Sequence, residues 1–169
     1  GGHPSLRAVL SAKKGEANIA RSIVALPRSA FLDQGHIRTV CTRVQFAADN
    51  CPQGAIYGKV RATTPLLDEA LEGPVYLRSS SNELPDMVAV LKGPPHRPIE
   101  IEAVARIDSI RGGIRANFET IPDAPITKVI VTMQGGRKGL LINSRNLCRS
   151  TNRATVQMDA HSGKAHDFR

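Results

Sequence analysis

Short stretches rich in Val, Ile and Thr recur about every ten residues along most of this 169-residue chain. Gly, Pro, Asn and Asp separate these stretches, which is typical of strands joined by tight turns. Strand-like and helix-like segments do not alternate, and this argues against a parallel α/β sheet. The pattern therefore predicts a mainly β protein, with a β-sandwich of Greek-key or jelly-roll type as the favoured architecture.

The strand pattern is clearest in ten segments, and a single domain spanning residues 1–169 would contain them all. The predicted strands are residues 6–13, 19–26, 56–64, 74–79, 87–92, 99–110, 114–121, 127–133, 140–143 and 153–160. Residues 14–18 predict a hairpin loop between the first two strands. Arg111-Gly112-Gly113 predicts a tight turn between two later ones.

Residues 29–50 differ from the rest of the chain because their apolar residues show partial 3.6-residue spacing. Ser29 and Thr39 can each serve as a helix N-cap. We expect a short helical insert here, of one or two helices, which ends before Cys51-Pro52.

The composition carries a surplus of positive charge, with 23 Lys and Arg against 15 Asp and Glu and a formal net charge of +8. Such a charge suits an anionic glycopolymer, a nucleic acid or an anionic lipid surface. The basic residues are spread widely and are not interleaved with aromatic residues, so a solvated basic surface is favoured over a nucleic-acid footprint. The cations near predicted hairpin tips, our candidates for anion contacts, are Arg111, Arg115, Arg137 and Lys138. No apolar run approaches the ~20 residues that a membrane-spanning helix needs, so no membrane span is expected.

Three cysteines, Cys41, Cys51 and Cys148, limit the chemistry further. Their spacing lacks the C-x-x-C or Cys/His pattern of a zinc site. A catalytic thiol would need a base, which the sequence does not identify. We favour a disulfide bond between Cys41 and Cys51, which would close a short loop. Cys148 then remains as a free thiol, or as the partner of a cysteine in a missing segment or another chain.

Clustered carboxylates provide the one candidate for hydrolytic chemistry. Asp68, Glu69 and Glu72 lie close together in sequence, and Asp86 follows in a later segment. Paired carboxylates can hydrolyse glycosides, and clustered ones can bind Ca²⁺, although the D-x-D-x-D-G spacing is missing. The remaining polar features are interpreted as surface or loop residues: His3, His36, His96, His161, His166, Ser79-Ser80-Ser81 and the 135–139 turn. No cofactor and no metal site is predicted.

Several motifs follow one another in a distinctive order. They are Ala25-Leu26-Pro27, Cys41, Asn50-Cys51-Pro52, Ile56-Tyr57-Gly58, Thr64-Pro65-Leu66-Leu67, residues 71–77, residues 121–125, Gly135-Gly136 and residues 143–148. This order, over residues 4–168, resembles a large uncharacterised family of secreted or surface-exposed proteins of high-GC Gram-positive bacteria, often modules of longer chains. The resemblance implies an extracytoplasmic location and supports the Cys41–Cys51 disulfide. It implies no activity, because none is established for the family.

We therefore expect a non-enzymatic structural, adhesive or assembly module of a bacterial cell-surface protein, with fibre formation as one variant. Its partners would be other envelope proteins or copies of itself. An alternative is a module that binds an anionic polymer (a polysaccharide, a teichoic acid or a nucleic acid) through its Arg-rich surface. A second alternative is a hydrolase that uses Asp68, Glu69 or Asp86.

Overall fold

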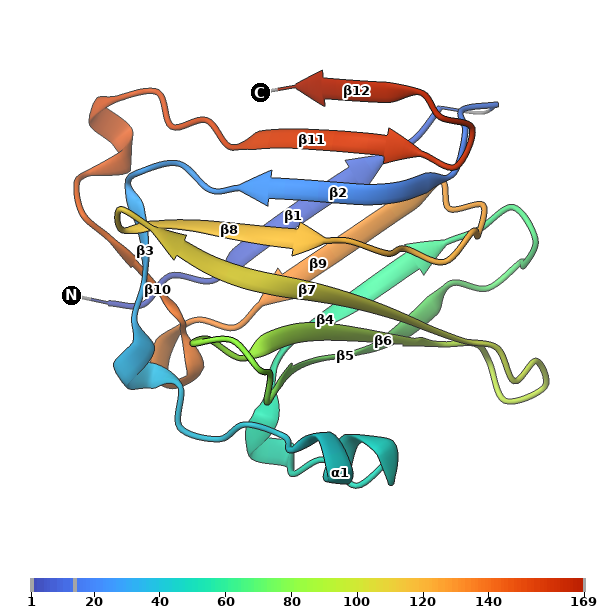
Figure 1. Ribbon diagram of the computed structural model, residues 1–169, viewed down its shortest axis with the longest axis horizontal. Coiled ribbons are helices and arrows are strands. Elements are labelled where there is room, and N and C mark those ends of the chain that lie inside the picture. Colours follow the sequence, from blue (N-terminus) through green and yellow to red (C-terminus); the bar gives the residue numbers. More distant parts are fainter. Residues whose placement is uncertain (1, 14, 169) are drawn as a thin grey trace.

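The computed structural model describes residues 2–13 and 15–168, and it is mainly β, as predicted (Figure 1). The strands are β1 (Leu6–Ser11), β2 (Ile19–Ala25), β3 (Ala30–Leu32), β4 (Ile56–Thr63), β5 (Leu71–Arg78), β6 (Asp86–Lys92), β7 (Glu100–Ile110), β8 (Gly113–Phe118), β9 (Lys128–Met133), β10 (Leu141–Asn143), β11 (Thr155–Ala160) and β12 (Ala165–Phe168). The helices are α1 (Arg43–Ala47) and the 3₁₀ turns η1 (Gln34–His36), η2 (Gln53–Ala55), η3 (Gly136–Lys138) and η4 (Leu147–Arg149).

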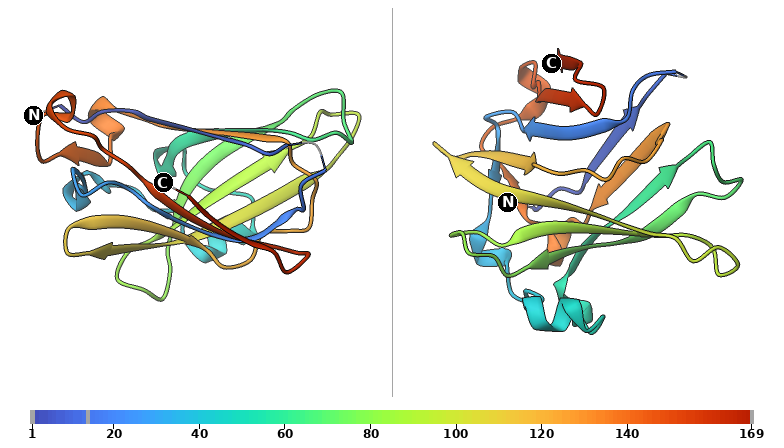
Figure 2. Two further views of the ribbon diagram at one scale, coloured as in Figure 1. Left: turned by 90° about the horizontal axis from the view of Figure 1, so that it is seen from above. Right: turned by 45° about the vertical axis from the view of Figure 1, so that its right-hand side comes forward.

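Ten of the strands form one antiparallel sheet, in the order β1-β9-β4-β5-β6-β7-β8-β2-β11-β12. This sheet curls over, so that β1 and β9 pass behind β2 and β8 in Figure 1, and the left view of Figure 2 shows the two layers from above. Strands β3 and β10 form a second, two-stranded sheet. The two layers thus belong to one continuous sheet, and a sandwich of two separate sheets is not confirmed.

The hairpin predicted between the first two strands was wrong. Strand β1 pairs with β9, and β2 pairs with β8 and β11, so the two consecutive strands lie in different layers. Part of the predicted loop, Lys14, lies outside the described residues. Local alternation fixes which segments are strands, but pairing partners depend on contacts that are distant in sequence.

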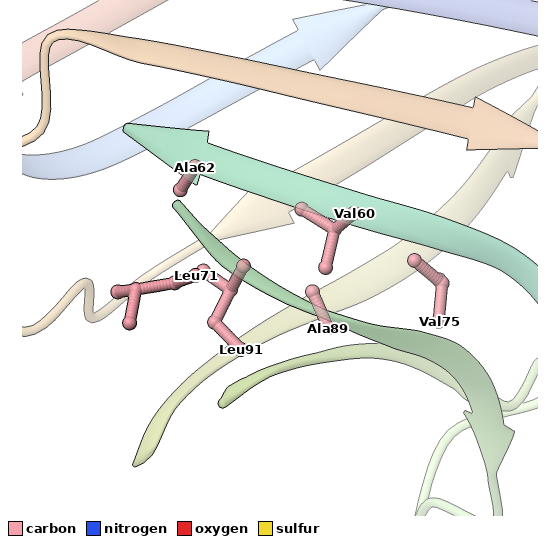
Figure 3. Packing of buried hydrophobic residues seen from close by; sticks show 6 residues of the cluster. All are labelled: Val60, Ala62, Leu71, Val75, Ala89 and Leu91. Carbon is pink, nitrogen blue, oxygen red and sulfur yellow. The ribbon is translucent and has the colours of Figure 1, made fainter. Parts of the chain in front are cut away.

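The main core lies on the inner face of β4, β5 and β6. It consists of Val60, Ala62, Leu71, Val75, Ala89 and Leu91, whose side chains point toward one another (Figure 3). Val129, Val131 and Met133 of β9 pack against this cluster. Fully burying one Leu or Val side chain stabilises a fold by about 1.5–3 kcal/mol, so burial of this cluster stabilises the packing of β4, β5 and β6.

A second cluster ties the 29–50 segment to the sheet. Tyr57, Leu77 and Leu140 are buried there. The Tyr57 hydroxyl accepts hydrogen bonds from the backbone N–H groups of Arg38 and Thr39, at 3.1 and 3.2 Å. The irregular segment therefore has a fixed position although it contains little regular structure.

The 29–50 segment contains short helices, but fewer of its residues are helical than expected. Ala30–Leu32, which we interpreted as helical, forms β3 and pairs with β10. Helix α1 begins after Thr42 rather than Thr39, because Thr42 and Gln45 form a reciprocal capping box. Ser29 is no helix cap, since it is buried and its hydroxyl donates to Asn152 at 2.6 Å.

The predicted disulfide between Cys41 and Cys51 is present, and it closes the loop that carries α1. Backbone hydrogen bonds at 2.8 Å join Cys41 to the end of β5, so the bond holds this loop against the sheet. The Cys148 thiol is exposed and is not disulfide-bonded within the described residues. None of the helices that the structure describes combines the length and apolar character needed to cross a membrane.

Candidate functional site

A broad groove of about 880 Å³ runs over the outer face of the sheet across β1, β9, β4 and β5. Strand register explains which side chains meet there. Lys59 on β4 lies opposite Thr132 on β9, and Thr132 lies opposite Arg7 on β1. Neighbouring strands lie about 4.8 Å apart, so the backbones at Arg7 and Lys59 are about 10 Å apart.

A second row of side chains crosses the same groove. Arg61 on β4 lies opposite Ile130 on β9 and opposite Glu72 on β5. Because residues two apart on a strand share a face, Lys59 and Arg61 both point away from the core that holds Val60. Three cations therefore line the groove, namely Arg7 from β1 and Lys59 and Arg61 from β4.

Only one acidic side chain, Glu72, lines the groove in the part of the chain that is described. It contacts the Arg61 guanidinium at 2.6 Å, and both side chains are about 60% exposed. An ion pair that is so open to water contributes little stability, about 0–1 kcal/mol, and exchanges readily with another anion. Neither Arg7 nor Lys59 forms an ion pair with any described residue.

The cations predicted for anion contacts have different surroundings. Lys138 points inward, with its ammonium group 3.1, 3.3 and 2.8 Å from the carbonyl oxygens of Gln53, Gly54 and Ile56. An ammonium group has three donors, so these carbonyls can engage all of them. Lys138 therefore holds η3 against η2 and the start of β4.

Arg115 is also committed within the fold, because it donates to Asp108 at 2.9 Å. Arg111 and Arg137 differ from these two. They lie exposed on the β7–β8 turn and in η3, without an ion pair among the described residues. The structure thus leaves two of the four predicted cations open to solvent, and neither lines the groove.

The candidate hydrolytic carboxylates do not come together. Asp86 begins β6 opposite Arg78, whereas Asp68 and Glu69 precede β5 at the other end of the hairpin. Glu72, near that other end, is about 20 Å along β5 from Arg78 at 3.3 Å per residue. Partial burial raises the pKa of the Asp86 carboxyl, and the Arg78 guanidinium, 3.8 Å away, opposes the rise.

A cluster of His3, Asp33 and His36 lies apart from the groove, beside η1. The His3 ring donates to the Asp33 carboxylate at 2.7 Å and stacks on the His36 ring, with centroids 3.6 Å apart. The hydrogen bond from His3 lowers the pKa of Asp33, desolvation opposes it, and the charge of His36 lowers it further. The two histidines, which the sequence predicts as surface or loop residues, are thus partly buried and packed against each other.

The signals for the missed residues were local and weak. Lys59 and Arg61 alternate with apolar residues in the predicted strand 56–64, which indicates that they share one exposed face. Asp33 and His36 are three residues apart, the spacing that brings side chains together on a 3₁₀ turn. The sequence contains no comparable signal for Arg7 or His3, because distant strand pairing and loop packing bring them to their sites.

Comparisons with protein-family models, with curated proteins and with solved structures find no match for this chain.

Proposed function

We propose that this chain is a non-enzymatic adhesive module of a bacterial cell surface, and that it binds an anionic polymer along the groove across β1, β9, β4 and β5. The observation that carries the proposal is the row of Arg7, Lys59 and Arg61 in one groove with a single exposed carboxylate. Positive charge gathered on a hollow surface raises the local concentration of an anionic ligand.

The shape of the groove favours a polymer over a compact ligand. It crosses four strands and is lined by backbone and short side chains on its floor, including Gly58, Gly73 and Pro74. A chain of repeating anionic groups can place successive charges against Arg7, Lys59 and Arg61. Two of these three are guanidinium groups, whose planar fork matches phosphate and carboxylate oxygens.

The groove residues also indicate how such a polymer would be recognised. None of the described residues that line the groove is aromatic, so stacking against sugar rings or bases has no platform there. Recognition would therefore depend on charge and spacing, with affinity that falls as salt rises.

The extracytoplasmic part of the proposal has separate support. The Cys41–Cys51 disulfide is of the kind that forms and persists in oxidising compartments. The motif resemblance to secreted proteins points the same way. Anionic glycopolymers are abundant outside bacterial cells, so the proposed ligand and the proposed location are mutually consistent.

A titration of fluorescently labelled polyphosphate tests the proposal. The groove variant combines Arg7→Gln, Lys59→Gln and Arg61→Gln. The matched control combines Arg97→Gln, Arg149→Gln and Arg153→Gln, which removes the same charge at exposed positions outside the groove. We expect the groove variant to lose about tenfold or more in affinity and the control to lose much less. Equal losses would mean that net charge alone attracts the polymer, and the proposal would fail.

A second candidate function, assembly with copies of itself, is favoured by the two edges of the large sheet. Strands β1 and β12 each pair on one side only, and all four residues of β12 are exposed. Unpaired edge strands offer backbone donors and acceptors to another chain. Light scattering over a wide concentration range measures this directly. A mass that rises with concentration supports assembly, and a constant monomer mass counts against it.

A further inference from the structure

Three side chains that ligate metals in proteins converge beside η1. His3 lies in the segment before β1, Asp33 is the N-cap of η1, and His36 is the last residue of that turn. One ligand atom from each lies within 4.8 Å of the other two. All three side chains are partly buried, so their positions are constrained by packing.

A backbone carbonyl fixes which ring nitrogen of His36 carries a hydrogen. Its Nδ1 lies 2.9 Å from the oxygen of Gly139, and a carbonyl oxygen can only accept, so Nδ1 carries the hydrogen. In the neutral ring Nε2 then has the free lone pair. Metal-ligating histidines are usually held in this way, with the second nitrogen donating to a carbonyl or carboxylate.

The packing of the 135–139 loop supports the same geometry. A Cβ on Gly139 would lie 2.3 Å from the Cβ of His3, and a Cβ on Gly135 would lie 2.7 Å from the backbone nitrogen of Ser5. The backbone N–H of Gly136 also donates to the His3 carbonyl at 2.8 Å. Two glycines therefore let this loop approach closely enough to hold both His3 and His36.

We propose that His3, Asp33 and His36 form a binding site for a divalent transition metal, with Zn²⁺ as the best-suited ion. Two imidazole nitrogens and one carboxylate oxygen suit zinc, and three protein ligands leave a fourth position for water. Zinc bonds of about 2.0–2.2 Å in a tetrahedral site place ligand atoms about 3.4 Å apart. The His3–Asp33 contact of 2.7 Å must therefore open as the metal replaces the hydrogen between them. The His3 and His36 rings, now stacked with planes 21° apart, must also turn so that both lone pairs meet at the ion.

The site would act as a cross-link in the fold. It joins the segment before β1 to η1, and His36 is held in turn by the 135–139 loop. These segments lie near the N-terminal end of the chain at the left of Figure 1. Metal binding there would anchor β1, an edge strand of the large sheet and one wall of the groove. The site does not depend on polymer binding, so each proposal can fail without the other.

Competition between the protein and a chromophoric zinc chelator measures the affinity. The ligand variants are His36→Gln and Asp33→Asn, since Asn retains the N-cap of η1. The matched control is His96→Gln, an exposed histidine in a different loop. Changes in the second shell alone lower metal affinity about 10- to 100-fold. We therefore expect each ligand variant to lose about tenfold or more and the control to be unchanged.

A measurement on the wild-type protein avoids any dependence on variant folding. In a nuclear magnetic resonance titration with Zn²⁺, the imidazole signals of His3 and His36 should shift together and saturate at one equivalent. Signals of His96, His161 and His166 should stay in place. The proposal is overturned if His3 and His36 do not shift at about 1 mM Zn²⁺. It is also overturned if a folded ligand variant loses less than about tenfold in affinity.

Discussion

Some basic side chains of this protein form contacts within the fold, whereas others remain open to a ligand, and the surroundings of each side chain determine its role. Lys138 lies 5.6 Å from the centre of the Tyr57 ring and contacts three backbone carbonyls, so its charge is used inside the fold. Arg7 and Lys59 line the groove, and neither forms an ion pair with a carboxylate in the part of the chain that the structure describes. Sequence alone does not distinguish these cases, because both kinds of cation occur in turns or strands next to polar residues.

Lys138→Met should therefore destabilise the fold, although the residue lies in a surface turn. The substitution leaves three carbonyl oxygens without their charged donor, and we expect a loss of about 2 kcal/mol in the free energy of unfolding. Arg137→Met, at the preceding and exposed position, is the control and should change stability by less than about 0.5 kcal/mol. Urea unfolding compares the two. Equal losses of stability in the two variants would contradict the conclusion that Lys138 holds η3 against η2 and the start of β4.

Asp86 should give the stability a distinctive pH dependence. Its folded-state pKa is raised above 3.8 by partial burial, so folding favours the protonated carboxyl and ionisation costs stability. Relative to Asp86→Asn, the wild type should be most stable below pH 3.8. This advantage should shrink as the pH rises through the folded-state pKa and then become constant. Urea unfolding of both proteins from pH 3 to 7 checks the sign, and an advantage that grows with pH would contradict it.

At the scale of elements, regular alternation was enough to find most strands but not their partners. Strand β4 alternates between buried and exposed residues, and its predicted range, 56–64, agrees closely with Ile56–Thr63. The turn predicted at Arg111-Gly112-Gly113 is confirmed as the β7–β8 hairpin. Strand β12 was missed because all its residues are exposed and no pattern is present. Strand β3 has only three residues, too few to show an alternating pattern, and it is defined by its pairing with the distant strand β10.

The β7–β8 turn offers a matched test of close packing. Gly112 and Gly163 both have positive φ, +77° and +81°, so both resist any side chain. A Cβ at Gly112 would lie 2.2 Å from the Phe31 ring, whereas nothing lies within 4 Å at Gly163. We expect Gly163→Ala to cost about 1 kcal/mol and Gly112→Ala about 1–3 kcal/mol more. Thermal unfolding measures both, and equal costs would mean that β3 does not pack on this turn.

The disulfide-closed loop around α1 offers a second test at this scale. Removing the bond in a Cys41→Ala, Cys51→Ala variant frees a short loop in the unfolded chain. Loop-closure entropy predicts a loss of about 3 kcal/mol. Cys148→Ala, at an exposed free thiol, should stay within about 0.5 kcal/mol of the wild type. The comparison is made by urea unfolding without reductant, and a double variant as stable as the wild type would contradict the account.

For the molecule as a whole, strand order creates the candidate site. Lys59 and Arg61 could be placed on one strand face from sequence, but Arg7 joins them only because β9 inserts between β1 and β4. The His3–Asp33–His36 cluster likewise brings His3 to a turn that lies 30 or more positions further along the chain. The composition indicated a basic protein. The strand pairing determines which of the basic residues lie close enough to bind one ligand together.

The most direct test of the polymer-binding account is the salt dependence of polyphosphate affinity. Each cation that displaces a counterion from a flexible single-stranded polyanion contributes about −0.7 to the slope of log K against log salt. Arg7, Lys59 and Arg61 together should therefore contribute about −2 to this slope. The groove variant should lose this part of the slope, and the control variant with Arg97, Arg149 and Arg153 replaced should retain it. Identical slopes for the wild type and the groove variant would show that the polymer does not bind in the groove.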